Sequence, residues 1–184
     1  GPEASKPVME GKGLLFKIFA DIDVFDIEVD AKDTERFIDT VKAIAPTFGG
    51  INLEDIKAPE AFEIEERLKA ELDIPIMHDD QHGTAIISAA ALLNALEITG
   101  KKIEEVKIVV SGAGASALSC AKLYTALGAN VSNIFMYDSK GLIHANRTDL
   151  DKYKQNFAVH TVDVTFEDAF KGADVFLGLS RAGL

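Results

Sequence analysis

The sequence predicts an α/β fold in which a doubly wound parallel sheet forms the second half. Apolar segments of strand length alternate with longer segments of helical periodicity along the chain. This alternation is typical of parallel sheets covered by helices. A glycine-rich turn, GAGASA at residues 112–117, follows the most β-branched segment and precedes a helical one. We therefore expect an α/β protein, with the glycine-rich turn in its second part.

The first part is predicted to alternate between helices and short strands. Segments with apolar residues at helical spacing are 12–19, 33–48 and 59–72. Segments of strand character are 22–29, 49–56 and 74–77. Asp33 is a typical helix cap, Pro46 ends the second helix, and Pro59 suits the first turn of the third. The strands that end near residues 56 and 77 are separated by one helix, which makes them candidate parallel neighbours.

The second part is predicted to begin with a helix from Thr84, whose Ala and Leu residues on all sides indicate burial between other elements. A strand at 106–111, a helix ended by Gly128 and a strand at 133–138 follow. Within this unit Gly112, Gly114 and Ala117 match the pattern GxGxxA. The first glycine permits a tight turn, the second lets a pyrophosphate approach the backbone, and the small third residue allows close helix packing. We expect a Rossmann-type dinucleotide site there.

Asp138 closes the second strand of this unit, 26 residues after Gly112. A carboxylate at this place can accept hydrogen bonds from an adenosine ribose, which favours NAD over NADP. Ser139 and Lys140 follow directly and could instead receive a 2′-phosphate, and an ordinary solvated turn is a third interpretation. The cofactor is therefore expected to be NAD, with NADP as the alternative.

Composition and charge narrow the class of partner. The 184 residues are 47% hydrophobic, and 30 acidic residues against 19 Lys and Arg give a formal net charge of −11. Because this charge repels nucleic acid and anionic membranes, we expect neither as a partner, and we find no signal or membrane segment. The single cysteine, Cys120, excludes an intramolecular disulfide and is expected to be a buried, inert thiol. A cytoplasmic location is the expectation.

Four acids stand at the ends of two predicted strands: Glu54 and Asp55 in LEDI, and Asp79 and Asp80 in HDDQH. Carboxylates that converge repel one another unless a divalent cation holds them, and oxygen ligands suit Mg²⁺ or Mn²⁺. The alternative is that these acids solvate loops or that Asp80 or Thr84 caps the next helix. The neighbouring His78 and His82 are weaker candidates as ligands, because no third nitrogen or sulfur ligand is apparent.

Five stretches, in this order and spacing, resemble bacterial-type malic enzymes: PVMEGKG, FGGINLEDIKAPE, HDDQHGTA, VVSGAGASA and ADVFLGLS. Enzymes of this family oxidatively decarboxylate L-malate to pyruvate with NAD or NADP and with Mg²⁺ or Mn²⁺. The resemblance covers essentially the whole chain. It implies that residues 1–77 belong to the family's N-terminal substrate and metal domain and residues 78–184 to its NAD(P)-binding domain. It also implies a homodimer or larger assembly.

The resemblance implies roles for individual residues. Glu54, Asp55 and Asp80 match the family's metal ligands, and Lys12 of MEGK matches the catalytic lysine. Asp79, which lies beside the ligands, is counted with Lys12 among the catalytic residues. Residues Gly112, Gly114 and Ala117 match those that line the dinucleotide pyrophosphate.

The resemblance also places the family's catalytic tyrosine and a substrate-binding arginine upstream of this sequence, and a substrate-binding asparagine downstream. The sequence therefore reads as an internal part of such an enzyme, incomplete for catalysis by itself. Two alternatives stay open at this point: another NAD(P)-dependent dehydrogenase that shares the nucleotide half, and a noncatalytic nucleotide-binding module.

Overall fold

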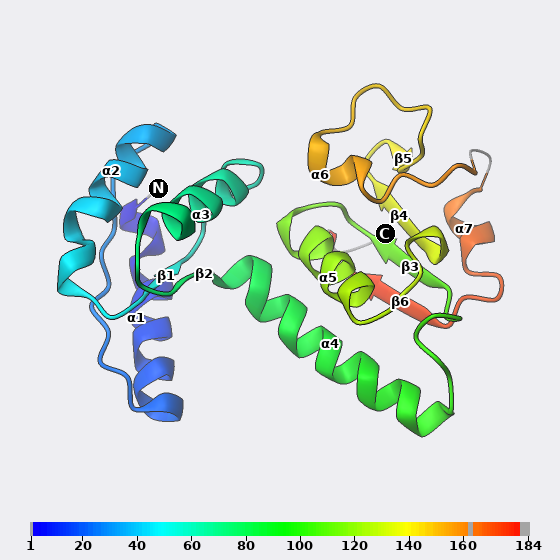
Figure 1. Cartoon of the computed structure of the whole chain (residues 1–184), viewed down its shortest axis with the longest axis horizontal. Helices are drawn as coiled ribbons and strands as arrows, with labels where there is room; N and C mark the ends of the chain where they lie inside the picture. Colours follow the sequence, from blue (N-terminus) through cyan, green and yellow to red (C-terminus); the bar gives the residue numbers. More distant parts are fainter. Residues whose placement is uncertain (1, 162–163, 181–184) are drawn as a thin grey trace. The chain divides into compact units, whose positions relative to one another are not determined.

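The computed structural model describes residues 2–161 and 164–180, and the chain divides into two compact units, Gly1–His78 and Asp79–Leu184. The first unit contains short parallel strands covered by helices (Figure 1). Its helices are α1 (Pro2–Ala20), α2 (Thr34–Ile44), the 3₁₀ helix η1 (Ala45–Thr47) and α3 (Glu60–Glu71), and its strands are β1 (Ile51–Leu53) and β2 (Ile76–His78). The predicted parallel pairing is confirmed, since Leu53 lies opposite His78 in register.

Local signals for α2 are confirmed. Asp33 caps the helix by accepting a hydrogen bond from the amide of Arg36 at 2.9 Å, and the α-helix gives way to η1 just before Pro46. The buried face of α2 packs with α3 and both strands into one hydrophobic core. Its buried members are Ile38, Val41, Leu53, Ile64, Leu68 and Ile76.

Residues 22–29 do not form the predicted strand, and this prediction was wrong. Alternating apolar residues make a strand only where one face is buried, and here Ile22, Val24 and Phe25 are all exposed. Lys6 of α1 pairs with Asp26 on this segment. Irregular backbone therefore follows α1, with ion pairs in place of a strand ladder.

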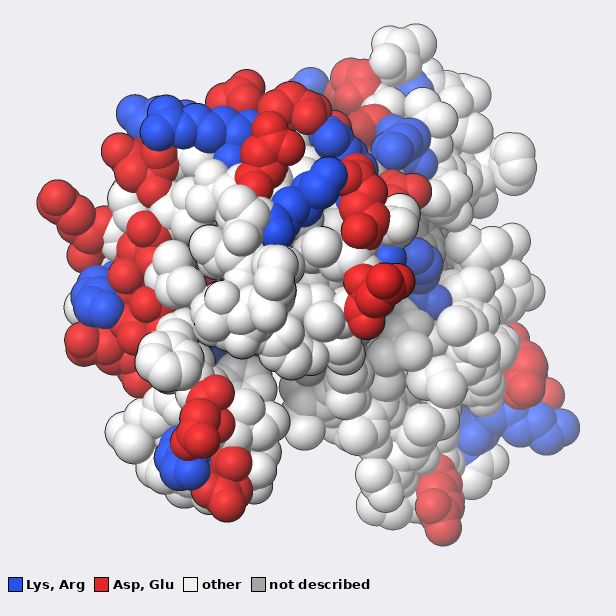
Figure 2. Space-filling model, turned by 60° about the vertical axis from the view of Figure 1, so that its left-hand side comes forward, with Lys and Arg blue, Asp and Glu red and all other residues white. Residues whose placement is uncertain are grey.

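The charged surface of the first unit is largely made of such pairs. Figure 2 shows acidic and basic side chains next to one another on the face that it presents. Between α2 and α3, Arg67 pairs with Glu35 and Lys42 pairs with Glu71. Exposed pairs of this kind add little stability each.

The second unit is a four-stranded sheet with helices beside it (Figure 1). Its elements are α4 (Asp79–Thr99), β3 (Ile108–Ser111), α5 (Ala115–Ala126), the 3₁₀ helix η2 (Val131–Asn133), β4 (Ile134–Asp138), β5 (Gly141–Leu142), α6 (Lys152–Gln155), α7 (Phe166–Ala169) and β6 (Val175–Gly178). The strand order is β5-β4-β3-β6, with β4 and β6 parallel to β3 and β5 antiparallel to β4. The chain thus moves from β3 to one side and later to the other, which confirms the predicted doubly wound topology. The last four residues of the predicted second part, 181–184, lie outside the described residues.

Helix α4 begins earlier than the sequence suggested. The structure places Asp79, Asp80 and Thr84 within the helix, so the alternative interpretation, in which Asp80 or Thr84 caps it, does not hold. Strand β2 ends at His78 and the chain passes directly into the helix, which leaves no loop for a separate cap.

The expectation of burial on all sides of α4 was also wrong. One face packs on α5, whereas Ile86, Ile87 and Ile98 are more than half exposed.

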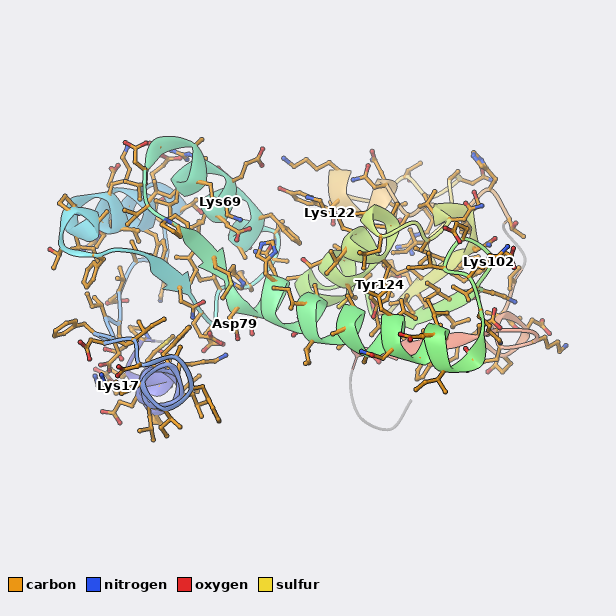
Figure 3. The ribbon with its side chains drawn as sticks, turned by 60° about the horizontal axis from the view of Figure 1, so that its bottom comes forward. Lys17, Lys69, Asp79, Lys102, Lys122 and Tyr124 are labelled. Atoms are coloured by element: carbon orange, nitrogen blue, oxygen red, sulfur yellow. The ribbon has the colours of Figure 1, made fainter. Side chains whose placement is uncertain are left out.

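Helix α5 carries the small and apolar residues that let it pack closely. Ala117, Cys120, Ala121 and Tyr124 of α5 are almost fully buried, and Figure 3 shows Tyr124 on this helix. Burial raises the pKa of the Cys120 thiol, which agrees with the prediction of an unreactive buried cysteine. Among the described residues, no helix has the length and apolar character needed to cross a membrane.

Candidate dinucleotide and metal site

The turn after β3 is built so that only glycine fits its first position. Gly112 has a φ of 112°, which side chains rarely adopt, and a Cβ there would lie 2.4 Å from the carbonyl oxygen of Leu179. The same turn is joined to the end of β6 by a hydrogen bond of 2.9 Å between the hydroxyls of Ser111 and Ser180. Since β4 and β6 flank β3, this turn lies where the strand order reverses. Ligands of open α/β sheets bind at such points.

The next positions fit a dinucleotide. Gly114 precedes the first residue of α5, makes no side-chain cap, and would have open space around an added Cβ. Gly114 thus offers no side-chain acceptor to the amides of the first turn of α5, and the positive end of a 12-residue helix dipole faces the same place. Ala117 is 1% exposed and allows the close packing that the motif requires. Donors, space and dipole all suit a pyrophosphate.

Asp138 is placed at the end of β4 as predicted, but its carboxylate already has partners. Arg147 donates to it with both ends of its guanidinium, Nη1 to Oδ1 at 2.8 Å and Nη2 to Oδ2 at 3.0 Å. The backbone amide of Lys140 donates to Oδ1 at 2.9 Å and Nζ of Lys154 donates to Oδ2 at 3.4 Å. These four hydrogen bonds use the four lone-pair positions of a carboxylate.

The charges around Asp138 form a compact network. Burial by itself would raise the pKa of Asp138, but the hydrogen bonds from Arg147 and the amide of Lys140 outweigh it and hold the pKa below its ordinary value. Arg147 also holds Asp149 through Nε at 3.0 Å and Nη2 at 2.9 Å, and Lys140 binds the same carboxylate at 2.7 Å. The network has three positive and two negative charges, on Arg147, Lys140, Lys154, Asp138 and Asp149. The carboxylate of Asp138 is therefore not a free acceptor for ribose hydroxyls.

In the first unit, Lys12 and Glu54 lie together. Nζ of Lys12 is 3.4 Å from Oε2 of Glu54, whose side chain is only 7% exposed, and the amide nitrogen of Asn52 donates to the same oxygen at 3.2 Å. Lys12 is thus a half-buried, paired lysine rather than a solvated one. Asp55 follows with a φ of 58°, a left-handed conformation uncommon outside glycine. Strained backbone of this kind is often found at functional sites.

In the second unit, the acids of HDDQH begin α4. Figure 3 shows Asp79 at the start of this helix. A Cβ on Gly83 would lie 2.3 Å from Oδ1 of Asp79, so the carboxylate of Asp79 folds back over the glycine one turn later. The hydroxyl of Ser116, on α5, donates to the backbone carbonyl of Asp80 at 2.6 Å. The glycine therefore leaves room for one acid, and the serine fixes the backbone of the other.

The predicted metal ligands are divided between the units: Glu54 and Asp55 belong to the first and Asp80 to the second. Within residues 2–161 and 164–180, no three His, Cys, Asp or Glu side chains form a group that could hold a metal ion. His78, the neighbour of these acids, is fully buried, and neither ring nitrogen has a hydrogen-bond partner.

Sequence reasoning missed Arg147, Lys154, Ser116 and Gly83. Arg147 and Lys154 are nine and sixteen residues from Asp138, which they bind. No local sequence pattern predicts such pairs. Ser116 stands inside the recognised turn motif, but its partner on another helix carries no sequence signal.

A mainly parallel sheet with a glycine turn at its switch point defines a Rossmann-type α/β protein. Residues 81–177 match the family model described as malic enzyme, NAD binding domain, and residues 31–69 match malic enzyme, N-terminal domain. The chain belongs to the malic enzyme family.

Relatives with this name match over the whole chain. It is 59% identical over 184 residues to the NADP-dependent malic enzyme of Halomonas elongata and 58% identical over 185 residues to the NAD-dependent malic enzyme of Rhizobium meliloti. The match covers 100% of this chain but 44% and 24% of those proteins. The chain thus spans less than half the length of these relatives.

Solved structures agree. The NAD-dependent malic enzyme of Thermotoga maritima matches 98% of this chain with a TM-score of 0.91 and 46% identity, over 49% of its own chain. The malic enzyme of Pyrococcus horikoshii matches 98% of this chain with a TM-score of 0.91 and 42% identity, over 44% of its own chain.

Proposed function

We propose that the protein carrying this chain oxidatively decarboxylates L-malate to pyruvate and CO₂, with reduction of NAD or NADP and a requirement for Mg²⁺ or Mn²⁺. The observation that carries this proposal is the match of the whole chain, at 58–59% identity, to proteins named malic enzymes. The turn geometry around Gly112 and Gly114 supports the dinucleotide part independently of the names.

The dinucleotide is proposed to bind with its pyrophosphate over Gly112, Gly114 and the first turn of α5, where Ala117 lets the helix approach. When bound, it supplies the nicotinamide that accepts hydride from C2 of malate. The chain contributes amide donors and a helix dipole, which hold the pyrophosphate without a charged side chain. Asp138 and its basic neighbours lie where the adenosine ribose is expected.

The metal is proposed to bind between Glu54, Asp55 and Asp80, with Asp79 supporting these ligands. Carboxylate oxygens are the ligands that suit a hard divalent cation. When bound, the cation supplies Lewis acidity toward the hydroxyl and carboxylate oxygens of malate.

Lys12 is proposed to carry the proton of the malate hydroxyl. Removal of that proton accompanies hydride loss from C2, after which the C3–C4 bond breaks and releases CO₂. The position of Lys12 supports this role, because its Nζ lies 3.4 Å from Oε2 of a proposed metal ligand. To accept the proton Lys12 has to be the neutral amine, a form that the positive charge of a cation bound nearby would favour.

The decisive experiment uses the full-length protein with malate, dinucleotide and Mn²⁺, and measures nucleotide reduction together with CO₂ release. The proposal expects both in equal amounts. Reduction without CO₂ would indicate another dehydrogenase, and dinucleotide binding without any reduction would indicate a noncatalytic module. Asp80→Asn should weaken Mn²⁺ binding in calorimetry by at least about tenfold, whereas the exposed Asp73→Asn should not. Equal Mn²⁺ affinity in both variants would remove the metal assignment.

We also propose that the protein is a cytoplasmic homodimer or larger assembly. The single cysteine supports a reducing compartment. Sedimentation of the full-length protein tests the assembly.

A further inference from the structure

Asp149 lies in the loop between β5 and α6 (Figure 1) and accepts hydrogen bonds from two cationic side chains. Arg147 donates through Nε to Oδ1 at 3.0 Å and through Nη2 to Oδ2 at 2.9 Å, and Nζ of Lys140 donates to Oδ2 at 2.7 Å. These hydrogen bonds hold the pKa of Asp149 below its ordinary value of 3.8, so the carboxylate is ionised at neutral pH. Three donor nitrogens thus converge on one anion.

The guanidinium of Arg147 is shared between two acids, one on each edge. The edge formed by Nη1 and Nη2 binds Asp138 at 2.8 Å and 3.0 Å, and both of these side chains are nearly buried. The edge formed by Nε and Nη2 binds Asp149, whose side chain is 37% exposed. Arg147 is therefore anchored to the end of β4 independently of Asp149, and Asp149 is the partner that solvent reaches.

The donors that hold Asp149 are those that a phosphate monoester takes. The Nε–Nη2 edge of an arginine forms parallel hydrogen bonds with two oxygens of a carboxylate or a phosphate, and a lysine adds a point charge. Asp138, at the end of β4, marks where an adenosine ribose is expected, and Arg147 joins it to Asp149. The donor set is therefore separated from the expected ribose position by a single guanidinium.

The charges of the network decide the sign of the effect that Asp149 has on a bound anion. Three positive charges against two negative ones leave a net charge of +1, and removal of the Asp149 charge would leave +2. A phosphate monoester carries about −1.5 to −2 at pH 7, which matches the second value. Because a phosphate and the Asp149 carboxylate need the same donors and repel each other, the presence of one opposes the other.

We propose that Arg147 and Lys140 form a site for the 2′-phosphate of NADP, and that Asp149 is its internal occupant, which the phosphate has to displace. This rests on the proposed function, since it takes the ligand of the second unit to be a dinucleotide. Asp149 is then a specificity-determining residue. Its carboxylate lowers the affinity for NADP and leaves the affinity for NAD, which has no 2′-phosphate, unchanged.

The test measures the binding of adenosine 2′,5′-bisphosphate and of 5′-AMP to the full-length protein by calorimetry, and compares the ratio of the two affinities among variants. Asp149→Asn keeps the size of the side chain and removes its charge, so the ratio should rise by about fivefold or more in favour of the bisphosphate. Asp149→Ser, a second neutral variant, should do the same. Asp149→Glu keeps the charge and should change the ratio by less than about twofold. Unchanged 5′-AMP affinity shows that a variant is folded.

Asp151→Asn is the matched control, because it removes the same charge two residues further along the loop. Asp151 caps α6 by accepting hydrogen bonds from the amides of Tyr153 and Lys154, and an asparagine oxygen can accept both. The ratio should stay within about twofold of its original value in this variant.

Two results overturn the proposal while 5′-AMP still binds. An equal rise of the ratio in Asp149→Asn and Asp151→Asn would show that only net charge matters. An unchanged or lower ratio in both neutral variants of Asp149 would show that its carboxylate does not compete with the phosphate. Failure of the unmodified protein to bind either nucleotide would instead contradict the proposed dinucleotide binding, and this proposal with it.

Discussion

Arg147 donates two hydrogen bonds from its guanidinium to the carboxylate of Asp138, at 2.8 Å and 3.0 Å. Both side chains are nearly buried, with 10% and 11% of their surface exposed. Planar bidentate pairs of this kind are the strongest side-chain hydrogen bonds between charged groups. Asp138, the predicted acceptor for ribose hydroxyls, therefore already accepts hydrogen bonds from within the protein.

The first prediction concerns the cofactor. Because the lone pairs of Asp138 are used, its charge does less to repel a 2′-phosphate, and the ammonium groups of Lys140 and Lys154 lie close by. The full-length protein should bind adenosine 2′,5′-bisphosphate at least as tightly as 5′-AMP in calorimetry. Replacing Lys140 and Lys154 together by Ala should weaken the bisphosphate by about tenfold and leave 5′-AMP almost unchanged.

Lys152→Ala serves as the control for that pair, because Lys152 is on the same short helix but lies against the Tyr153 ring. Clear preference of the unmodified protein for 5′-AMP would restore the interpretation that Asp138 selects NAD.

The second prediction concerns stability and pH. The pKa of Asp138 lies below its ordinary value of 3.8, so its network stabilises the folded protein above that pH and loses this contribution as pH falls through the lowered pKa. Asp138→Asn should reduce the free energy of unfolding by about 2 kcal/mol at pH 7. The gap between the variant and the unmodified protein should shrink below about pH 4.

Denaturant unfolding at pH 7, 5 and 3 measures this gap, with Glu97→Gln on the exposed side of α4 as the control. A gap that stays constant from pH 7 to pH 3 would show that the charge of Asp138 contributes nothing through its pKa.

The third prediction separates two glycines of one turn. Gly112→Ala should destabilise the second unit by more than about 2 kcal/mol, because the backbone is left-handed and the new Cβ meets the Leu179 carbonyl. Gly114→Ala meets nothing within 4 Å and should cost much less stability. It should nevertheless weaken dinucleotide binding, since the added methyl lies where the pyrophosphate is proposed to approach. Thermal unfolding and calorimetry together distinguish the two effects.

The predictions made from the sequence were confirmed where a structural feature depends only on neighbouring residues. The cap at Asp33 and the glycine turn at Gly112 depend on a few neighbouring residues, and both are present in the structure. The prediction of a strand at residues 22–29 failed because alternation does not say whether a partner strand exists, and no strand among the described residues pairs with this segment.

The candidate site divides in the same way. The motif residues could be named from the sequence, but their contacts could not. Arg147 binds Asp138 nine residues away, beyond β5, and Ser116 binds Asp80 thirty-six residues away. Such contacts depend on how helices and strands pack, which no spacing in the sequence specifies.

The last prediction uses the space over Gly83. Alanine is a better helix former than glycine by about 1 kcal/mol, so Gly83→Ala in the first turns of α4 should not destabilise the fold. The new Cβ would nonetheless lie 2.3 Å from Oδ1 of Asp79, and the carboxylate must move away. If Asp79 supports the proposed metal ligands, kcat of the full-length protein should fall by at least about tenfold while the melting temperature is kept.

A double-mutant cycle gives the control. Asp79→Ala removes the group that Gly83→Ala would displace, so adding Gly83→Ala to Asp79→Ala should change kcat no further. Equal and additive losses in the two backgrounds would mean that Gly83 acts through something other than the Asp79 carboxylate. A normal kcat in Gly83→Ala, with the melting temperature raised, would show that the position of Asp79 does not matter for the reaction.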